Sequence, residues 1–125
     1  MAEAFVDPGG IQGYHAHIYY DAETRQIAAR LREAIGNRFD VVLGRWREEA
    51  VGPHPVPMYQ AAFATAEFPR IVPWLMLNRG GLDVLVHPQT GDSYDDHAIH
   101  ALWLGTPLPL RLDGMRRRQA EARGR

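Results

Sequence analysis

Two helical segments, each lying between two strand-like segments, constrain the fold of this chain more than any other feature. Residues 24–35 carry apolar side chains at helical spacing, follow Asp21 as a capping residue and end at Gly36. Residues 67–77 form a second helical segment, which stops at the run Asn, Arg, Gly, Gly. Strands are expected on both sides of each helix, and in chain order they cover residues 14–20, 39–51, 58–65 and 82–87.

The order strand, helix, strand, strand, helix, strand predicts an α+β fold. It is the ferredoxin-like βαββαβ sandwich, a four-stranded antiparallel sheet with two helices on one face, here followed by a C-terminal extension. We expect the sheet order 4-1-3-2, with strands one and three parallel at its centre. The domain would cover residues 14–113, after a flexible arm over 1–13 and before an Arg-rich tail over 114–125. A chain of 125 residues, 46% of them hydrophobic, suits one domain with a substantial core.

Charge and composition exclude several classes of function. The net charge of −1 gives no general attraction to nucleic acid or to a membrane surface, and no apolar run approaches the roughly 18 residues that span a bilayer. The first twelve residues lack the apolar core of a secretory signal, so we expect a cytoplasmic protein. The chain has no cysteine, which excludes disulfides and thiolate chemistry. Any metal would be held by His, Asp, Glu, Tyr or water.

Four of the six histidines lie where the predicted strands begin or end. His15 and His17 are two residues apart in the first strand and therefore share one face. His54 lies in a loop between two prolines, and His87 ends the fourth strand. In the expected sheet, the starts of strands one and three and the end of strand four meet at one edge. Because clustered imidazoles commonly hold transition metals, the sequence predicts a metal site there.

The alternation of the first strand predicts which face holds this site. Ala16 and Ile18 are apolar and should face the helices, so His15, His17 and Tyr19 should point to the opposite face. In a monomer, two helices on one side of a single sheet would leave its second face uncovered. We therefore expect it to be covered by a second subunit in a homodimer, by the C-terminal segment, or by both, with a small-molecule pocket between them.

Several motifs, in order along residues 13–113, give the chain a specific resemblance. They are Tyr14-His15-Ala16-His17-Ile18-Tyr19, Val51-Gly52-Pro53-His54-Pro55, residues 74–82, residues 85–92, Asp96-His97 and Trp103-Leu104-Gly105. With these motifs the chain resembles the bacterial and fungal DOPA 4,5-dioxygenase family. The resemblance implies a dimeric ferredoxin-like protein that opens the ring of a catechol such as L-DOPA by extradiol cleavage, with non-haem Fe(II) and O₂.

The roles of the individual histidines stay open at this point. Three of His15, His17, His54 and His87 are expected to bind the metal, and a carboxylate such as Asp83 could replace one imidazole. The fourth histidine, or His97 oriented by Asp96, would act as acid or base. The position of His15 at the shared edge favours it as a ligand, whereas the deeper His17 would reach the substrate ring.

Three further residues are candidates for contact with the substrate. Tyr19 and Trp103 would form walls of the pocket or of the core, and Arg79 would have either a structural role or bind a substrate carboxylate. Two alternative functions remain. One is a non-catalytic dimeric module that binds a small aromatic ligand, and the other is a zinc-dependent hydrolase, since imidazoles hold Zn²⁺ equally well.

Overall fold

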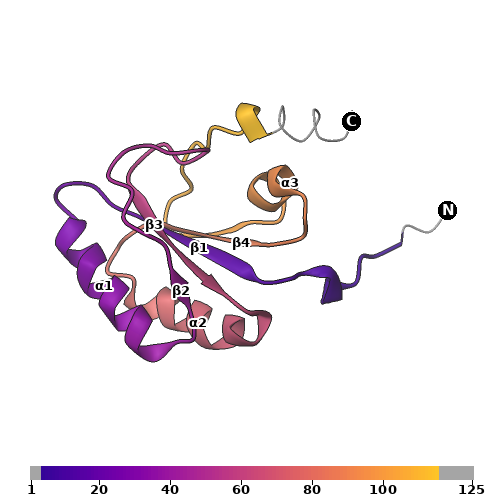
Figure 1. Cartoon of the computed structure of the whole chain (residues 1–125), viewed down its shortest axis with the longest axis horizontal. Coiled ribbons are helices and arrows are strands. Elements are labelled where there is room, and N and C mark those ends of the chain that lie inside the picture. The colour runs from indigo at the N-terminus through magenta and orange to yellow at the C-terminus, as the bar shows by residue number, and fades with distance from the viewer. Residues whose placement is uncertain (1–3, 116–125) are drawn as a thin grey trace.

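The computed structural model describes residues 4–115, which form a sheet with helices on both sides (Figure 1). Two longer helices, α1 and α2, cover one face of the sheet, and the short helix α3 lies on the other face (Figure 1). In chain order the elements are the 3₁₀ helix η1 (Pro8–Gly10), β1 (Tyr14–Tyr19), α1 (Arg25–Arg38), β2 (Val42–Leu43), β3 (Met58–Phe63), the 3₁₀ helix η2 (Thr65–Glu67), α2 (Phe68–Asn78), β4 (Val84–Pro88), α3 (Ser93–Ala98) and β5 (Leu102–Leu104). This order confirms the predicted α+β ferredoxin-like fold.

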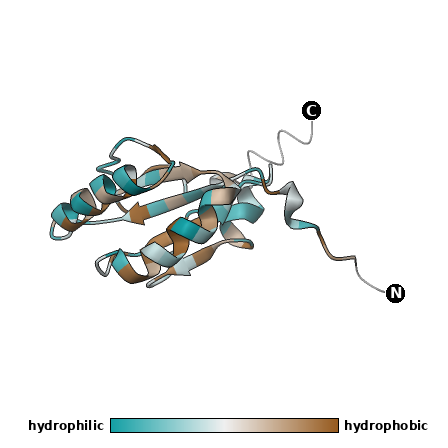
Figure 2. Ribbon diagram, turned by 90° about the horizontal axis from the view of Figure 1, so that it is seen from below, coloured by the Kyte–Doolittle hydropathy of each residue, from teal (hydrophilic) through white to brown (hydrophobic). Residues whose placement is uncertain are grey.

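The main core lies between the sheet and the two longer helices. Ala16 and Ile18 on β1 and Val84 and Val86 on β4 are buried there against both helices, as the strand alternation predicts. The helices contribute Ala28, Leu31 and Ile35 from α1 and Ile71, Val72 and Leu75 from α2. Each fully buried Val, Leu or Ile stabilises the fold by about 1.5–3 kcal/mol. Figure 2 shows that α2 is the more hydrophobic of the two helices, whereas α1 is largely hydrophilic outside its core positions.

The direction of β3 corrects the sequence prediction. The sheet order is β2-β3-β1-β4-β5 and all four neighbouring pairs are antiparallel, so β1 and β3 do not run parallel. The helical crossover makes β1 and β2 parallel, and β3 turns back between them. The start of β3 therefore lies beside the end of β1, with Met58 opposite Tyr19, while His15 lies opposite His87 at the other end. The predicted shared edge of His15 and His87 is confirmed, whereas the prediction that His54 reaches the same edge with the start of β3 was wrong.

The sheet has five strands where the sequence predicted four. The additional strand, β5, pairs with β4 and comes from the predicted C-terminal extension. Its pairing with β4 holds it in the sheet. A strand of three residues is too short to show a recognisable alternation of apolar and polar side chains in the sequence. The six-residue helix α3 was not predicted either, for the same reason.

The second strand is much shorter than the predicted 39–51. Regular pairing covers only Val42–Leu43, and a single bridge joins Arg47 to Met58 further along. Gly44 follows the paired residues, and the ring of Trp46 packs on Tyr59 in the helix-facing core. Glycine weakens a strand because it has no side chain to pack.

The structure describes most of the predicted N-terminal arm but little of the predicted C-terminal tail. The last residues before β1 pair with the segment after β4, since Gln12 N donates to Gln89 O and Gln89 N donates to Gly13 O, each over 2.8 Å. The predicted Arg-rich tail lies outside the described residues apart from its first two positions. Across residues 4–115, the structure contains no helix with the length and apolarity needed to cross a bilayer.

Candidate metal centre

Five histidines gather on the sheet face that α1 and α2 leave free. His17 is central, with its ring centroid 4.1 Å from that of His54, 5.1 Å from that of His87 and 5.9 Å from that of His15. The ring of His97, on α3, lies 3.9 Å from that of His87. The structure therefore brings together all four predicted ligands and adds His97, and it buries His17, His54 and His87 almost completely.

The sheet register positions the first three of these side chains. His15 lies directly opposite His87 in the β1–β4 pair, and His17 is two residues further along the same face. As a result, His17 Nε2 lies 3.0 Å from His87 Nε2. Gln89, two residues after His87, places its amide nitrogen against both ring nitrogens of His15, at 3.2 Å from Nδ1. The sequence analysis missed Gln89, although the two-residue period of β4 would have placed it on the histidine face.

A tight turn carries His54 into the cluster from the opposite end of β1. The backbone N–H groups of Val51 and His54 each donate to the carbonyl of the other residue, over 3.2 and 2.9 Å. Gly52 between them has φ of 55°, a backbone conformation that favours glycine. The C-terminal segment holds this turn, because Arg111 N donates to Pro53 O over 2.8 Å.

The helix α3 presents His97, and Asp96 anchors that helix. Asp96 is buried and its carboxylate accepts hydrogen bonds from the backbone N–H and the hydroxyl of Thr90. His97 Nδ1 instead donates to Ser93 O over 2.7 Å. Within residues 4–115 no hydrogen bond joins Asp96 to His97, so Asp96 acts on His97 through the position of α3 and through its charge, which opposes the lowering of the His97 pKa by burial. A catalytic role for the pair stays a prediction.

Backbone carbonyls fix the protonation pattern of two rings. Pro88 O accepts from His87 Nδ1 over 2.9 Å, and Ser93 O accepts from His97 Nδ1. A carbonyl can only accept, so each Nδ1 carries the proton and each neutral ring has a lone pair on Nε2. Metal-binding histidines are typically held in this way. His17 differs from these two rings. Because His87 Nε2 has only a lone pair, His17 Nε2 donates to it, while His17 Nδ1 is buried without a partner among the described residues. The proton can therefore move to Nδ1, which leaves Nε2 free to act as a metal ligand.

The cluster keeps its histidines neutral. Burial is the main cause of a lowered pKa for all five rings, and repulsion from neighbouring histidines adds to it for His15, His17, His54 and His87. Together these effects lower the pKa of His54 to about 4 and that of His87 to about 3. A metal ligand must be unprotonated, so these rings are prepared for a cation at neutral pH.

The donor set fits a transition-metal ion. Two groups of three histidines, which share His17, have ligand atoms within 4.8 Å of one another: His15, His17 and His87, and His17, His54 and His97. Imidazole suits iron, zinc and copper. Two ligands at right angles on metal–nitrogen bonds of about 2.1 Å lie about 3 Å apart, which matches the 3.0 Å between His17 Nε2 and His87 Nε2.

The remaining predicted residues divide between the two faces of the sheet. Tyr19 and Trp103 stack on the histidine face, with ring centroids 5.8 Å apart, in a small second core with Met58 and Leu85. Arg79 lies at the end of α2, in the helix layer behind the sheet, and donates to the carbonyls of Met76 and Leu82. The structure does not bring Arg79 to the histidines. Asp83 accepts from Thr106 N at the end of the sheet far from His87.

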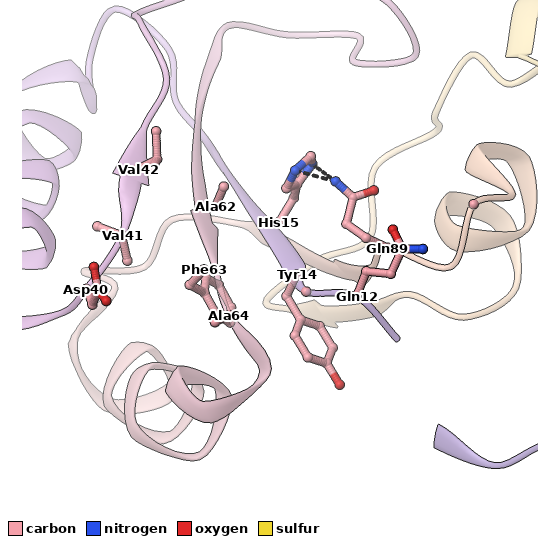
Figure 3. Close-up of a pocket in the computed structure, with 12 residues that line it drawn as sticks. Gln12, Tyr14, His15, Asp40, Val41, Val42, Ala62, Phe63, Ala64 and Gln89 are labelled. Carbon is pink, nitrogen blue, oxygen red and sulfur yellow. Dashed lines mark hydrogen bonds between the residues drawn. The ribbon is translucent and has the colours of Figure 1, made fainter. Parts of the chain in front are cut away.

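A cavity of about 610 Å³ opens beside His15 (Figure 3). His15 and Gln89 meet on one side of it, and Val42 and Ala62 extend across the sheet from them, with Asp40 just before the start of β2 (Figure 3). Its volume lies within the range of about 300–1,000 Å³ that is usual for small-molecule sites. The arrangement can therefore hold a small aromatic molecule next to the histidine cluster.

Comparisons with known proteins agree on one group of relatives. The sequence profile of the Dopa 4,5-dioxygenase family matches residues 14–114. An uncharacterized 21.2 kDa protein of Botryotinia fuckeliana is 39% identical over 130 residues, covering 92% of this chain and 71% of the relative. A DOPA 4,5-dioxygenase of Amanita muscaria is 36% identical over 111 residues, or 82% of this chain. The chain spans about half the length of that relative, 49%.

A solved structure supports the same grouping. The crystal structure of a candidate dioxygenase from Nostoc punctiforme, at 1.46 Å resolution, superposes with a TM-score of 0.90 and is 54% identical in sequence. The match covers 90% of this chain and 98% of the other. These similarities confirm the resemblance stated from the motifs and support an oxygenase enzyme. The chain belongs to the Dopa 4,5-dioxygenase family.

Proposed function

We propose that the protein is a non-haem iron extradiol dioxygenase that opens the ring of a catechol such as L-DOPA with O₂. The observation that carries the proposal is the cluster of five neutral histidines on one sheet face, next to a cavity, in a chain of this family. The reaction needs no external reductant. It breaks the carbon–carbon bond beside one hydroxyl, and both oxygen atoms of O₂ enter the product.

His15, His17 and His87 would hold the iron. The 3.0 Å between the Nε2 atoms of His17 and His87 and the carbonyl-fixed ring of His87 support this set. His15 completes it and borders the cavity. Three imidazoles leave further coordination positions free, as non-haem iron oxygenases require. Bound iron would supply the Lewis-acid and electron-transfer chemistry that joins O₂ to a catechol.

The surrounding side chains would handle the substrate and its proton. His97 is neutral and has a bare Nε2, so it can accept the proton of a phenolic hydroxyl. Val42 and Ala62 offer apolar surface to the ring in the cavity beside His15. Tyr19 and Trp103, stacked on each other, form the opposite wall of the site. Their packing limits the access of water to the cluster from that side.

A homodimer would complete the cavity. The C-terminal segment and α3 cover the half of the histidine face over β4 and β5. The half over β2 and β3 stays open, and Val42 there is 73% exposed. A second copy of the chain on this half would enclose the cavity and remove apolar surface from water, which favours association by ~25 cal/mol per Å².

The test begins with protein purified without oxygen and analysed for metal. Reconstituted with Fe(II), it should consume one O₂ per catechol and form a yellow ring-opened product. His87→Ala should abolish iron retention and turnover, whereas His100→Ala, at an exposed histidine outside the cluster, should keep both. Catechol binding without O₂ uptake would favour a binding module. Hydrolysis by the zinc form without oxygen would favour a zinc hydrolase.

A further inference from the structure

The hydrogen bond between Tyr19 and His54 distinguishes His54 from the other histidines of the cluster. Tyr19 Oη lies 2.7 Å from His54 Nδ1. The two residues are 3% and 4% exposed, so this contact is shielded from water. Tyr19 comes from β1 and His54 from the turn before β3, and both are fixed by backbone hydrogen bonds, Tyr19 N to Asp83 O and His54 N to Val51 O.

The hydroxyl proton of Tyr19 has one acceptor available. A phenol ordinarily has a pKa of about 10, so Tyr19 carries its hydroxyl proton at neutral pH. Among the described residues its recorded hydrogen-bond partner is His54 Nδ1. A buried hydroxyl that fails to donate costs about 1–3 kcal/mol. Tyr19 therefore donates to His54, and His54 Nδ1 is the acceptor.

The proton of His54 must then lie on the other ring nitrogen. A neutral imidazole carries one proton, and with Nδ1 accepting, that proton is on Nε2. A nitrogen that carries a proton has no lone pair for a metal. His87 and His97 show the opposite pattern, because each donates from Nδ1 to a carbonyl and leaves Nε2 bare. The partner of Nδ1, tyrosine hydroxyl or carbonyl, thus separates a donor ring from two acceptor rings.

We propose that His54 is the hydrogen-bond donor of the metal centre and not a ligand, and that Tyr19 is the positioning residue that fixes it in this state. The inference rests on the proposed function and deepens it. The Nε2–H of His54, in a ring that contacts His17, would donate to an oxygen atom of the bound catechol or of dioxygen. A fixed donor stabilises negative charge that develops on such an oxygen without any reorganisation of water.

The first experiment compares metal binding by variants. Apo-protein is titrated with Fe(II) without oxygen, against a competing chelator, for wild type, His54→Phe, Tyr19→Phe and His87→Phe. We expect His54→Phe and Tyr19→Phe to bind one iron per chain with an affinity within about threefold of wild type. The affinity of His87→Phe for Fe(II) should fall by about 10-fold or more. In turnover, His54→Phe should lower kcat about 100-fold with little change in KM, as for loss of a proton-donating group.

The second experiment reads the tautomer directly in the wild-type protein. Two-bond ¹⁵N–¹H NMR spectra of ¹⁵N-histidine-labelled apo-protein distinguish rings protonated on Nε2 from rings protonated on Nδ1. We expect His54 in the Nε2–H form and His87 and His97 in the Nδ1–H form. A His54 ring protonated on Nδ1, or loss of iron from folded His54→Phe, would overturn the inference. Failure of wild-type protein to bind iron or to turn over any catechol would instead overturn the proposed function.

Discussion

Acid should destabilise the metal-free protein through its buried histidines, and His87 allows the size of the effect to be worked out. Burial, together with repulsion from neighbouring histidines, lowers the pKa of His87 from 6.5 to about 3. In the unfolded chain the same ring titrates near 6.5, so between these values the unfolded state binds more protons than the folded state. The stabilising effect of the neutral ring is complete above pH 6.5 and declines as the pH falls toward about 3.

The loss is large compared with the stability of a small domain. At pH 4.5 the unfolded-state pKa of 6.5 has been passed by two units, and each unit corresponds to about 1.36 kcal/mol, so His87 alone removes about 2.7 kcal/mol. The free energy of unfolding of a typical domain is only about 5–15 kcal/mol. The lowered pKa of His54 acts in the same direction. The contributions of the two rings do not add in full, because part of the lowered pKa of His87 comes from repulsion by His54.

The assay is urea unfolding of chelator-treated protein between pH 7.5 and pH 4.5, followed by tryptophan fluorescence. His87→Gln should flatten the pH dependence, whatever it does to the stability at pH 7.5. His100→Gln, which changes an exposed ring, should leave the slope as in wild type. Equal free energies of unfolding at pH 7.5 and pH 4.5, or an unchanged slope in His87→Gln, would refute the reasoning.

Three further outcomes are expected. Light scattering should give twice the 14.1 kDa chain mass, and Val42→Glu should shift it to one chain mass; a wild-type monomer at micromolar concentration contradicts the dimer. Addition of Fe(II) or Zn²⁺ should raise Tm by a similar amount at pH 7.5 and at pH 5.5, because His87, with a pKa of about 3, is neutral at both pH values; an equal gain in His87→Gln contradicts histidine ligation. Asp40 is the acidic residue that lines the cavity, so kcat/KM should be about fivefold higher for a catechol with an aminoethyl group than for one with a carboxymethyl group. Asp40→Asn should remove this preference and leave kcat/KM for 4-ethylcatechol unchanged.

The sheet face that carries the site could be predicted from the sequence, but the end of the sheet from which His54 enters it could not. The two-residue period of a strand places His15 and His17 opposite Ala16 and Ile18 whatever the strand pairs with, so that prediction was confirmed. The end of the sheet at which His54 arrives depends on the direction of β3, which is a property of the whole topology. Because the predicted direction of this strand was wrong, His54 was placed at the edge of His15 and His87 instead of at the other end of β1.

Short elements explain the remaining differences. The position of His97 depends on α3, which has six residues and is held by the capping side chain of Asp92 and by the bonds of Asp96 to Thr90. None of these contacts follows from a periodic pattern. From the sequence, Arg79 was a candidate either for a structural role or for binding a substrate carboxylate. In the structure it closes the end of α2 in the helix layer.

The pairing of His17 with His87 joins residues 70 positions apart in the chain, and the Tyr19–His54 contact joins residues 35 apart. A growing chain therefore cannot assemble the centre until its last histidine strand has been synthesised and has paired with β1. Contacts of such long range form late and cooperatively, since the entropy of closing long loops must be overcome first. Under the proposed function, a chain that ends before β4 lacks His87 and so cannot yet hold the ion with the full set of ligands.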